Sequence, residues 1–221
     1  MAAFIIQKSY IPKAQTDVAQ LFMVLTRSAQ AEDIAAADGV LKVLSARFPS
    51  AVLLSISLSE ADALPPGLSE AEEGAWLERI QPQWLSFITE QQRQYGVEPA
   101  ATAIVGVGTL GALVLELAKL EQPVAGRLIS FGARFIRLPE QPLSLAQTLH
   151  LLHAANDAEV AAKHSQIAHL AIQNLAADST LDVLQGIEDS LDPALITQLR
   201  VRLETCIPLR ILKEIQAATG E

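Results

Sequence analysis

The chain has a single cysteine, Cys206, among its 221 residues, so it cannot build an internal disulfide framework. A lone cysteine fits a reducing compartment, and we expect a cytoplasmic protein. The chain also lacks a basic leader before a long apolar run, and no window approaches the roughly 20 apolar residues of a transmembrane helix. We therefore expect no signal peptide and no membrane partner.

Positive charge is scarce: Lys and Arg number 16 against 25 Asp and Glu, which gives a formal net charge of −9. Nucleic acids and anionic membranes attract basic surfaces, so this balance disfavours both as partners. Aromatic residues make up 5% of the chain, yet half of all residues are apolar, enough for a substantial core. No repeat or low-complexity tract divides the sequence, and residues 1–221 are predicted to form one domain.

Strand-like and helix-like segments alternate, which predicts an α/β fold with a mostly parallel central sheet and helices on both faces. Pro82 is expected to kink the longest helix or mark its true start, and Asp192 to cap the last one. The irregular loop 59–68 is placed to overhang a pocket. The expected strands are 4–11, 18–25, 51–57, 101–106, 127–131, 147–152 and 180–184, and the clearest helices are 70–95, 158–176 and 193–203.

The most informative stretch is Gly106-Val107-Gly108-Thr109-Leu110, which follows one expected strand and opens a helix-like run ending near Lys119. A strand, a tight turn and a helix form the context of the Gly-x-Ser-x-Gly nucleophile elbow, whose sharp turn exposes a serine hydroxyl above the sheet. Glycine stands where that motif has its serine.

Almost the whole chain, from about Phe4 to about Ile215, resembles the phospholipase/carboxylesterase family of α/β-hydrolases, and in particular its small bacterial serine esterases. The resemblance implies an α/β-hydrolase-like fold and a carboxylic ester hydrolase as the ancestral activity. It rests on segments in the family's order: Phe22 after an apolar strand, Arg47 to Ser55, Ala103 to Gly106, Gly126 to Phe135, Leu138-Pro139, and His150 to Asp157.

The same resemblance assigns the vestigial triad. The nucleophile falls on Gly108, which has no side chain, and the closing glycine of the elbow falls on Leu110. The acid falls on Asp157 and is retained. The histidine of a Gly-His pair falls on Glu188-Asp189, so a carboxylate stands where a neutral imidazole should act as base.

The oxyanion loop of the family, a glycine-rich His-Gly segment, falls on Met23, Val24, Leu25, Thr26 and Arg27. Without glycines the backbone loses the freedom to turn an amide toward an oxyanion, which leaves little beyond the Thr109 amide at a helix N-terminus. Because loss of the serine or histidine alone costs roughly 10⁶ in kcat in a model serine protease, these combined losses predict a catalytically silent scaffold.

Other sites are less well supported. Gly106 to Gly111 matches the dinucleotide pattern Gly-x-Gly-x-x-Gly, but the next expected strand ends without the acidic residue that would hold a ribose. His150 and His153 are expected to be satisfied core histidines. His164 and His169 lie five apart on a helix, do not share a face as metal ligands, and are expected at the surface. The sequence predicts no cofactor and no metal ion.

Two leftover features point to function. Asp157 and Asp189 are expected to approach one another, so that the proton affinity of at least one rises, or the pair holds a cation or a basic group; two exposed surface acids are the plain alternative. Met23 and Leu110 replace small or polar family positions with aliphatic side chains, which predicts an apolar plug. Cys206 is expected to be a packing residue rather than a nucleophile.

Two classes of function stay open. The first is a binding or regulatory protein on a hydrolase scaffold, which takes a small apolar ligand or a protein partner or forms a homodimer through the apolar run from Cys206 to Ile215. The second is an active hydrolase with a relocated nucleophile that uses Asp157 and an unidentified base. Its candidate nucleophiles are Ser28, Ser57, Ser130 and Thr109. The residues favour the first class.

Overall fold

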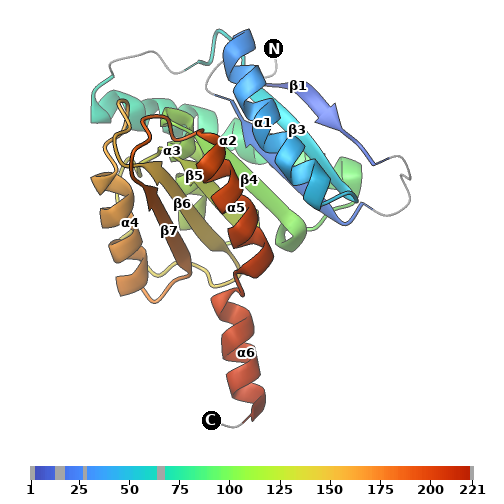
Figure 1. The fold of residues 1–221 in the computed structure, drawn as a ribbon, viewed down its shortest axis with the longest axis vertical. Coiled ribbons are helices and arrows are strands. Elements are labelled where there is room, and N and C mark those ends of the chain that lie inside the picture. Colours follow the sequence, from blue (N-terminus) through green and yellow to red (C-terminus); the bar gives the residue numbers. More distant parts are fainter. Residues whose placement is uncertain (1–2, 13–17, 27–28, 64–67, 220–221) are drawn as a thin grey trace.

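The computed structural model describes residues 3–12, 18–26, 29–63 and 68–219. Its centre is a seven-stranded sheet in the order β1-β3-β2-β4-β5-β6-β7. Only the β1–β3 pairing is antiparallel, and every other neighbouring pair is parallel (Figure 1). The strands are β1 (Phe4–Tyr10), β2 (Gln20–Leu25), β3 (Ala51–Leu58), β4 (Thr102–Val107), β5 (Arg127–Phe131), β6 (Thr148–Ala154) and β7 (Ser179–Leu184). All seven expected strands are confirmed within two residues at their ends.

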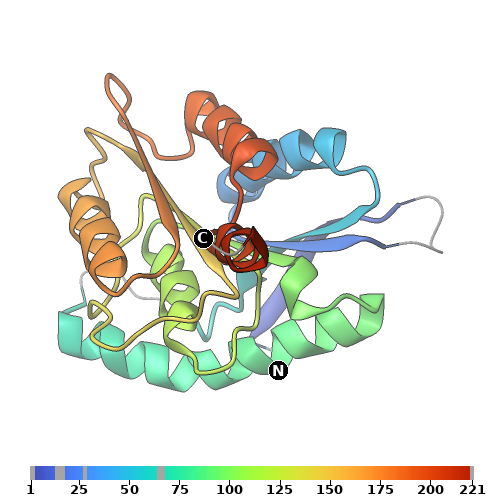
Figure 2. The same ribbon diagram turned by 90° about the horizontal axis from the view of Figure 1, so that it is seen from below.

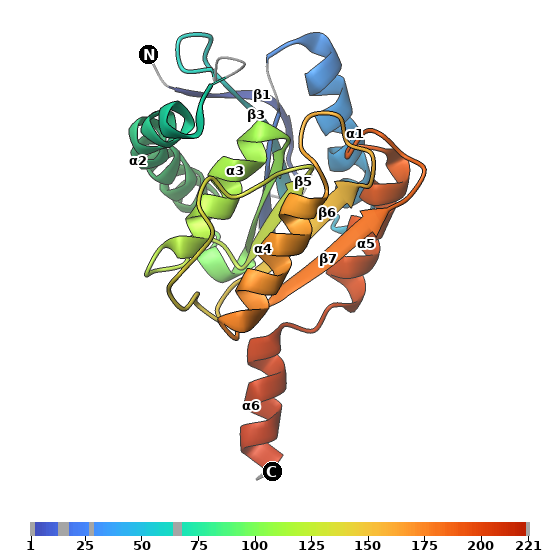
Figure 3. The same cartoon turned by 90° about the vertical axis from the view of Figure 1, so that its left-hand side faces the viewer.

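Helices cover both faces of the sheet (Figure 3). One face carries α2 (Glu70–Tyr95), α3 (Thr109–Glu116), the short 3-10 helix η2 (Leu117–Lys119) and α4 (Lys163–Asn174). The other carries α1 (Ala31–Arg47) and α5 (Pro193–Thr205). The expected α/β architecture, a mostly parallel sheet between two helical layers, is confirmed.

The sheet is apolar on both faces because helices cover both. Every residue of β3, β4 and β6 is buried, and alternate side chains enter two separate cores. Leu54 and Ile104 pack with Trp84 of α2 on one side, while Leu53 and Val105 pack on the other side with α1 and α5. Near-continuous burial explains why these strands are recognisable as apolar runs.

The long helix α2 has its predicted bounds, whereas the helix predicted from Ala158 begins later. The long helix α2 begins at Glu70, where Ser69 and Glu72 form a capping box, so Pro82 lies inside the helix and does not mark its start. The helix predicted from Ala158 begins only at Lys163. The carboxylate of Asp157 accepts the N–H groups of Glu159 and Val160 and holds this stretch in a turn.

A helix that was predicted only as an apolar run ends the described chain. This helix, α6 (Leu209–Thr219), stands below the sheet and apart from the other helices (Figures 1 and 2). The expected cap of α5 is confirmed, since Asp192 accepts the N–H of Ala194 at 2.8 Å. Within the described ranges, no helix has the length and apolar character needed to cross a bilayer.

Candidate active site

The carboxyl ends of the parallel strands meet at one edge of the sheet, where ligands bind in open α/β sheets. The chain leaves β3 and returns on the opposite side of β2, so β2 and β4 are neighbours at the point where the strand order reverses. Thr26 follows β2, Gly108 follows β4, Gly132 follows β5 and Asp157 lies just beyond β6. The topology therefore places the predicted site residues at the ends of neighbouring strands.

The chain turns sharply at Gly108, between β4 and α3. Gly108 has φ 57° and ψ −135°, in a region that L side chains rarely adopt and glycine adopts freely. Its N–H donates to the carbonyl of Phe131 at 2.8 Å, which fixes the turn against β5. The backbone is thus sharply bent at the predicted position, and no side chain projects from it.

Close packing of α3 on the sheet depends on two glycines. A Cβ at Gly106 would lie 2.7 Å from the Cα of Gly111, and a Cβ at Gly111 would lie 2.3 Å from the Cβ of Ala133. The sequence assigned the closing small residue of the elbow to Leu110, but the close approach is made at Gly111. Leu110 itself is 2% exposed and packs in the core.

The first three residues assigned to the oxyanion loop, Met23 to Leu25, lie in strand β2 and not in a loop. Met23 and Val24 lie in the middle of β2, paired with Ile104 and Val105 of β4, and neither is solvent-exposed. The strand continues to Leu25 because its pairing with β3 and β4 does, and the N–H of Thr26 still donates to Ile56. The turn that follows β2 therefore begins at Thr26, and Arg27 and Ser28 lie outside the described residues.

Asp157 is held by three hydrogen bonds. Its Oδ1 accepts the N–H groups of Glu159 at 2.9 Å and Val160 at 3.0 Å, and its Oδ2 accepts the hydroxyl of Ser190 at 2.5 Å. Burial of the carboxyl opposes its ionisation, but the Ser190 hydroxyl and the two amides outweigh burial and lower the pKa of Asp157. Asp157 thus accepts hydrogen bonds at both of its carboxylate oxygens.

Ser190, which sequence reasoning missed, is the side-chain partner of Asp157. It is fully buried, and its hydroxyl also accepts the N–H of Ala154 at 3.0 Å. A Cβ at Gly132 would meet both Asp157 Oδ2 and Ser190 Oγ at 2.7 Å, so the three residues are packed without spare room. The signal in the sequence was small: a serine one position after the assigned histidine site.

Asp189, the assigned histidine position, is exposed and accepts the N–H of Leu191 at 2.8 Å, in a turn before α5. The described contacts of Asp157 and Asp189 are therefore to different partners, namely Ser190 with two amides and the Leu191 amide. The expected carboxylate pair stays a prediction.

The two histidines of β6 are satisfied core residues, as predicted. His150 is fully buried and lies 2.8 Å from the hydroxyl of Thr180. Burial, with the nearby charge of Arg127, lowers the pKa of His150 to about 3. His153 bonds through its two ring nitrogens to the Ser165 hydroxyl and the Val160 carbonyl. Neither imidazole is available as a base.

The remaining histidines and the cysteine do not form a reactive cluster. His164 and His169 are half-buried rather than at the surface, and His169 bonds to Ser179 at 2.8 Å. The carbonyl of the half-buried Cys206 accepts from Arg127. Among the residues that the structure describes, no three His, Cys, Asp or Glu side chains gather as metal ligands do.

Two of the alternative nucleophiles are inaccessible. Ser57 and Ser130 are both fully buried inside strands, and Ser57 accepts a hydrogen bond from Gln7 at 2.8 Å. A hydroxyl without solvent exposure cannot meet a substrate carbonyl unless the sheet opens. The other two candidates, Ser28 and the side chain of Thr109, lie outside the described part of the chain.

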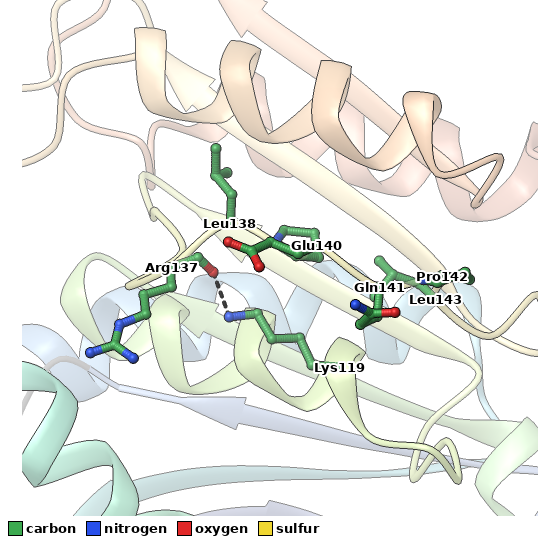
Figure 4. A pocket seen from close by; sticks show the side chains of 8 residues that line it. Lys119, Arg137, Leu138, Glu140, Gln141, Pro142 and Leu143 are labelled. Carbon is green, nitrogen blue, oxygen red and sulfur yellow. Dashed lines mark hydrogen bonds between the residues drawn. The ribbon is translucent and has the colours of Figure 1, made fainter.

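A hollow of about 350 Å³ lies away from the elbow, beside the end of η2 (Figure 4). Lys119 lies along it and donates to the carbonyl of Arg137, and it also bonds to Glu116 at 2.6 Å. The hollow has no histidine, serine, threonine or cysteine among its described lining residues. With Lys119 engaged by Glu116 and the Arg137 carbonyl, the other charged side chains of the lining are Arg137 and Glu140.

Comparison with known proteins agrees with the fold. No protein-family model matches the chain. Esterase YpfH of Escherichia coli (strain K12) is 31% identical over 153 residues, and the match spans about two thirds of each protein, 66% of either chain. The crystal structure of esterase PE8 is similar with a TM-score of 0.73 at 17% identity, over 90% of this chain and 98% of that one. Bacillus cereus carboxylesterase has a TM-score of 0.69 at 12% identity, over 92% and 94%. The chain is therefore an esterase homologue that belongs to the α/β-hydrolases by fold.

Proposed function

We propose that this chain is a catalytically silent α/β-hydrolase, a pseudo-esterase that acts by binding. The observation that carries the proposal is Gly108, which adopts the left-handed turn of an elbow but has no side chain to attack a carbonyl. Covalent ester hydrolysis needs a nucleophile within reach of a base, and the described part of the elbow supplies neither.

The engagement of Asp157 adds a second argument. In a working triad the acid orients and stabilises a histidine through one carboxylate oxygen. Here Oδ2 of Asp157 is taken by Ser190 and Oδ1 by two backbone amides. The retained acid therefore serves as a strut between the turns that follow β6 and β7, which supports a structural rather than catalytic role.

The apolar plug bears on what the scaffold binds. Met23 is fully buried, Leu110 is 2% exposed, and both belong to the same core cluster. Leu110, two residues after Gly108, fills the core beside the elbow and leaves less room there for a small apolar ligand, whereas Met23 packs in the middle of β2. Their burial favours a protein partner, or a second copy of the chain, over such a ligand.

Hydrolysis of p-nitrophenyl butyrate tests the proposal. We expect the purified wild type to show no turnover above a mock purification from cells without the gene. Turnover well above that background, retained in Asp157→Asn, would instead reveal a relocated nucleophile independent of the triad; turnover lost in Asp157→Asn would reveal one that uses Asp157. Either result would overturn the silent scaffold.

Variants that restore the assigned catalytic residues provide a second test. The double variant Gly108→Ser/Asp189→His restores the assigned nucleophile and base, but Ser190 still holds Oδ2 of Asp157. The triple variant, which adds Ser190→Ala, frees that oxygen. We expect more activity from the triple than from the double variant, with Gly108→Ser/Ser190→Ala as the control that lacks the histidine.

A further inference from the structure

Helix α6 carries a wide apolar face that its own chain leaves exposed. At 100° per residue, Ile211, Leu212, Ile215 and Ala218 lie on one side of the helix and the charged residues lie on the other. Leu212 is 42% exposed and Ile215 is 53% exposed. An isolated helix of 11 residues is marginal in water, so its stability requires that this face pack against something.

Hydrogen bonds join the N-terminal end of α6, and Cys206 just before it, to the body of the protein. The N–H of Leu209 donates to Asp178 at 2.9 Å, and Arg210 donates to the carbonyl of Ala146 at 3.3 Å. Arg127 donates to the carbonyl of Cys206 at 3.4 Å. These bonds hold the start of α6 at the lower edge of the sheet, and the helix extends away from the body from there (Figure 1). The apolar face is thus presented to another molecule.

The same edge of the sheet carries a complementary surface. A groove of about 430 Å³ lies where β4, β5 and β6 begin, next to the Ala146 carbonyl that anchors Arg210. We call it the lower-edge groove. Its lining is apolar apart from one exposed acid, and consists of Glu98, Pro99, Ala100, Pro123, Ala125 and Ala146.

The charges on α6 and beside the groove bear on whether α6 contacts a second copy of the chain or a membrane. Two cations, Arg210 and Lys213, outnumber the one anion, Glu214, among the described side chains of α6, whereas the chain as a whole carries −9. Beyond Arg210, which is anchored to its own chain, Lys213 is a described cation of α6, and Glu98 borders the groove, so the helix can bring a positive charge to the acidic rim of the groove. The described residues of α6 include no aromatic side chain to anchor the helix in lipid.

We propose that α6 is a dimerisation helix, whose apolar face lies in the lower-edge groove of a second copy of this chain. Helix and groove lie at the same edge, so a two-fold axis below the sheet lets the two copies exchange their helices reciprocally. The face is wider than the seam of a two-helix coil, which fits simultaneous contact with the partner's groove and the partner's α6. This inference does not depend on the loss of catalysis.

Sedimentation velocity of the full chain over a concentration series tests the proposal. We expect a species of twice the 23.7 kDa chain mass that dissociates on dilution. Leu212→Glu places a charge in the apolar face and should raise the dimer dissociation constant at least about tenfold. Ala217→Glu is the matched control: it adds the same charge on the opposite side of α6 and should leave the dimer intact.

The groove provides an independent variant, because Ala100→Arg alters no residue of α6 and should also dissociate the dimer. Circular dichroism and thermal unfolding show whether each variant is folded. A wild type that is monomeric at about 100 μM overturns the proposal. This holds also if the monomer binds phosphatidylcholine vesicles in a flotation assay. The proposal is equally overturned by a dimer that folded Leu212→Glu and Ala100→Arg leave intact, or that Ala217→Glu disrupts equally.

Discussion

The hydroxyl of Ser190 donates to Oδ2 of Asp157 at 2.5 Å, and the same oxygen of Ser190 accepts the N–H of Ala154 at 3.0 Å. One buried serine thereby ties the turn after β7 to the last residue of β6 and to the acid that follows it. The contact joins residues 33 positions apart in the chain.

Removal of that hydroxyl is expected to destabilise the fold. Ser190→Ala leaves a buried N–H of Ala154 without its acceptor and removes a donor from an ionised carboxylate, so we expect a loss of about 2–3 kcal/mol. Urea unfolding measures it. Ser86→Ala, at an exposed serine on α2, is the control and should change stability by less than about 0.5 kcal/mol. Equal losses of stability in the two variants would contradict the stabilising role of the Ser190 hydroxyl.

Gly132 is expected to tolerate no side chain. It has φ 57°, and a Cβ there would lie 2.7 Å from both Asp157 Oδ2 and Ser190 Oγ. Gly132→Ala should therefore lower the free energy of unfolding by more than about 2 kcal/mol, which thermal unfolding would show as a lower melting temperature. Gly74→Ala is the matched control inside α2, where a Cβ meets nothing within 4 Å, and it should stabilise the protein by up to about 1 kcal/mol.

The imidazole of His150 is expected to stay neutral through the physiological range. Burial and the charge of Arg127 lower its pKa from 6.5 to about 3. The unfolded chain binds this proton and the folded chain does not, so His150 costs stability progressively as pH falls from about 6.5 toward 3. In NMR titrations its ring signals should not move between pH 8 and 5. A midpoint near 6.5 for His150 would refute its burial in the core.

Asp38 of α1 is expected to contribute stability in the opposite manner. Burial opposes its ionisation, but hydrogen bonds from Lys8, Tyr10 and Lys42 outweigh burial and lower its pKa from 3.8 to about 2. Its contribution is present above pH 3.8 and is lost as pH falls through 2. Because Lys8 and Lys42 are largely exposed, we discount this contribution to roughly 1 kcal/mol.

Comparison of the wild type with Asp38→Asn measures that contribution. The difference in unfolding free energy between the two proteins should shrink as pH falls from 4 to 2. Glu32→Gln, at an exposed acid in the first turn of the same helix, should show no comparable change. A wild-type–variant difference that stays constant over this range would exclude the proposed linkage.

The sheet could be predicted because its strands are short apolar runs between turn residues. That pattern is local: a run such as Leu128 to Phe131 must be buried on both faces wherever it is placed. Helix ends were less predictable. The start of α4 was misplaced by five residues because Asp157 binds the amides that would otherwise begin the helix, and propensity alone does not show this.

The candidate site was predicted unevenly for a related reason. Gly108 was found because the elbow is a contiguous motif whose turn forms between adjacent residues. The oxyanion segment was placed inside β2, since hydrogen bonding to two neighbouring strands, not the residues themselves, decides where that strand stops. Ser190 was missed because its partner, Asp157, lies 33 residues earlier in the chain, in the turn after a different strand.

The sequence by itself determined the α/β fold, the turn between strand and helix at Gly108 and the core positions of His150 and His153, because composition and local spacing control them. Only the tertiary structure decided that Asp157 is bound by Ser190 and that Gly132 leaves no room beside them. It also decided that α6 points away from its own body. These features depend on contacts between residues far apart in the chain, and such contacts exist only once the sheet has brought its strand ends together.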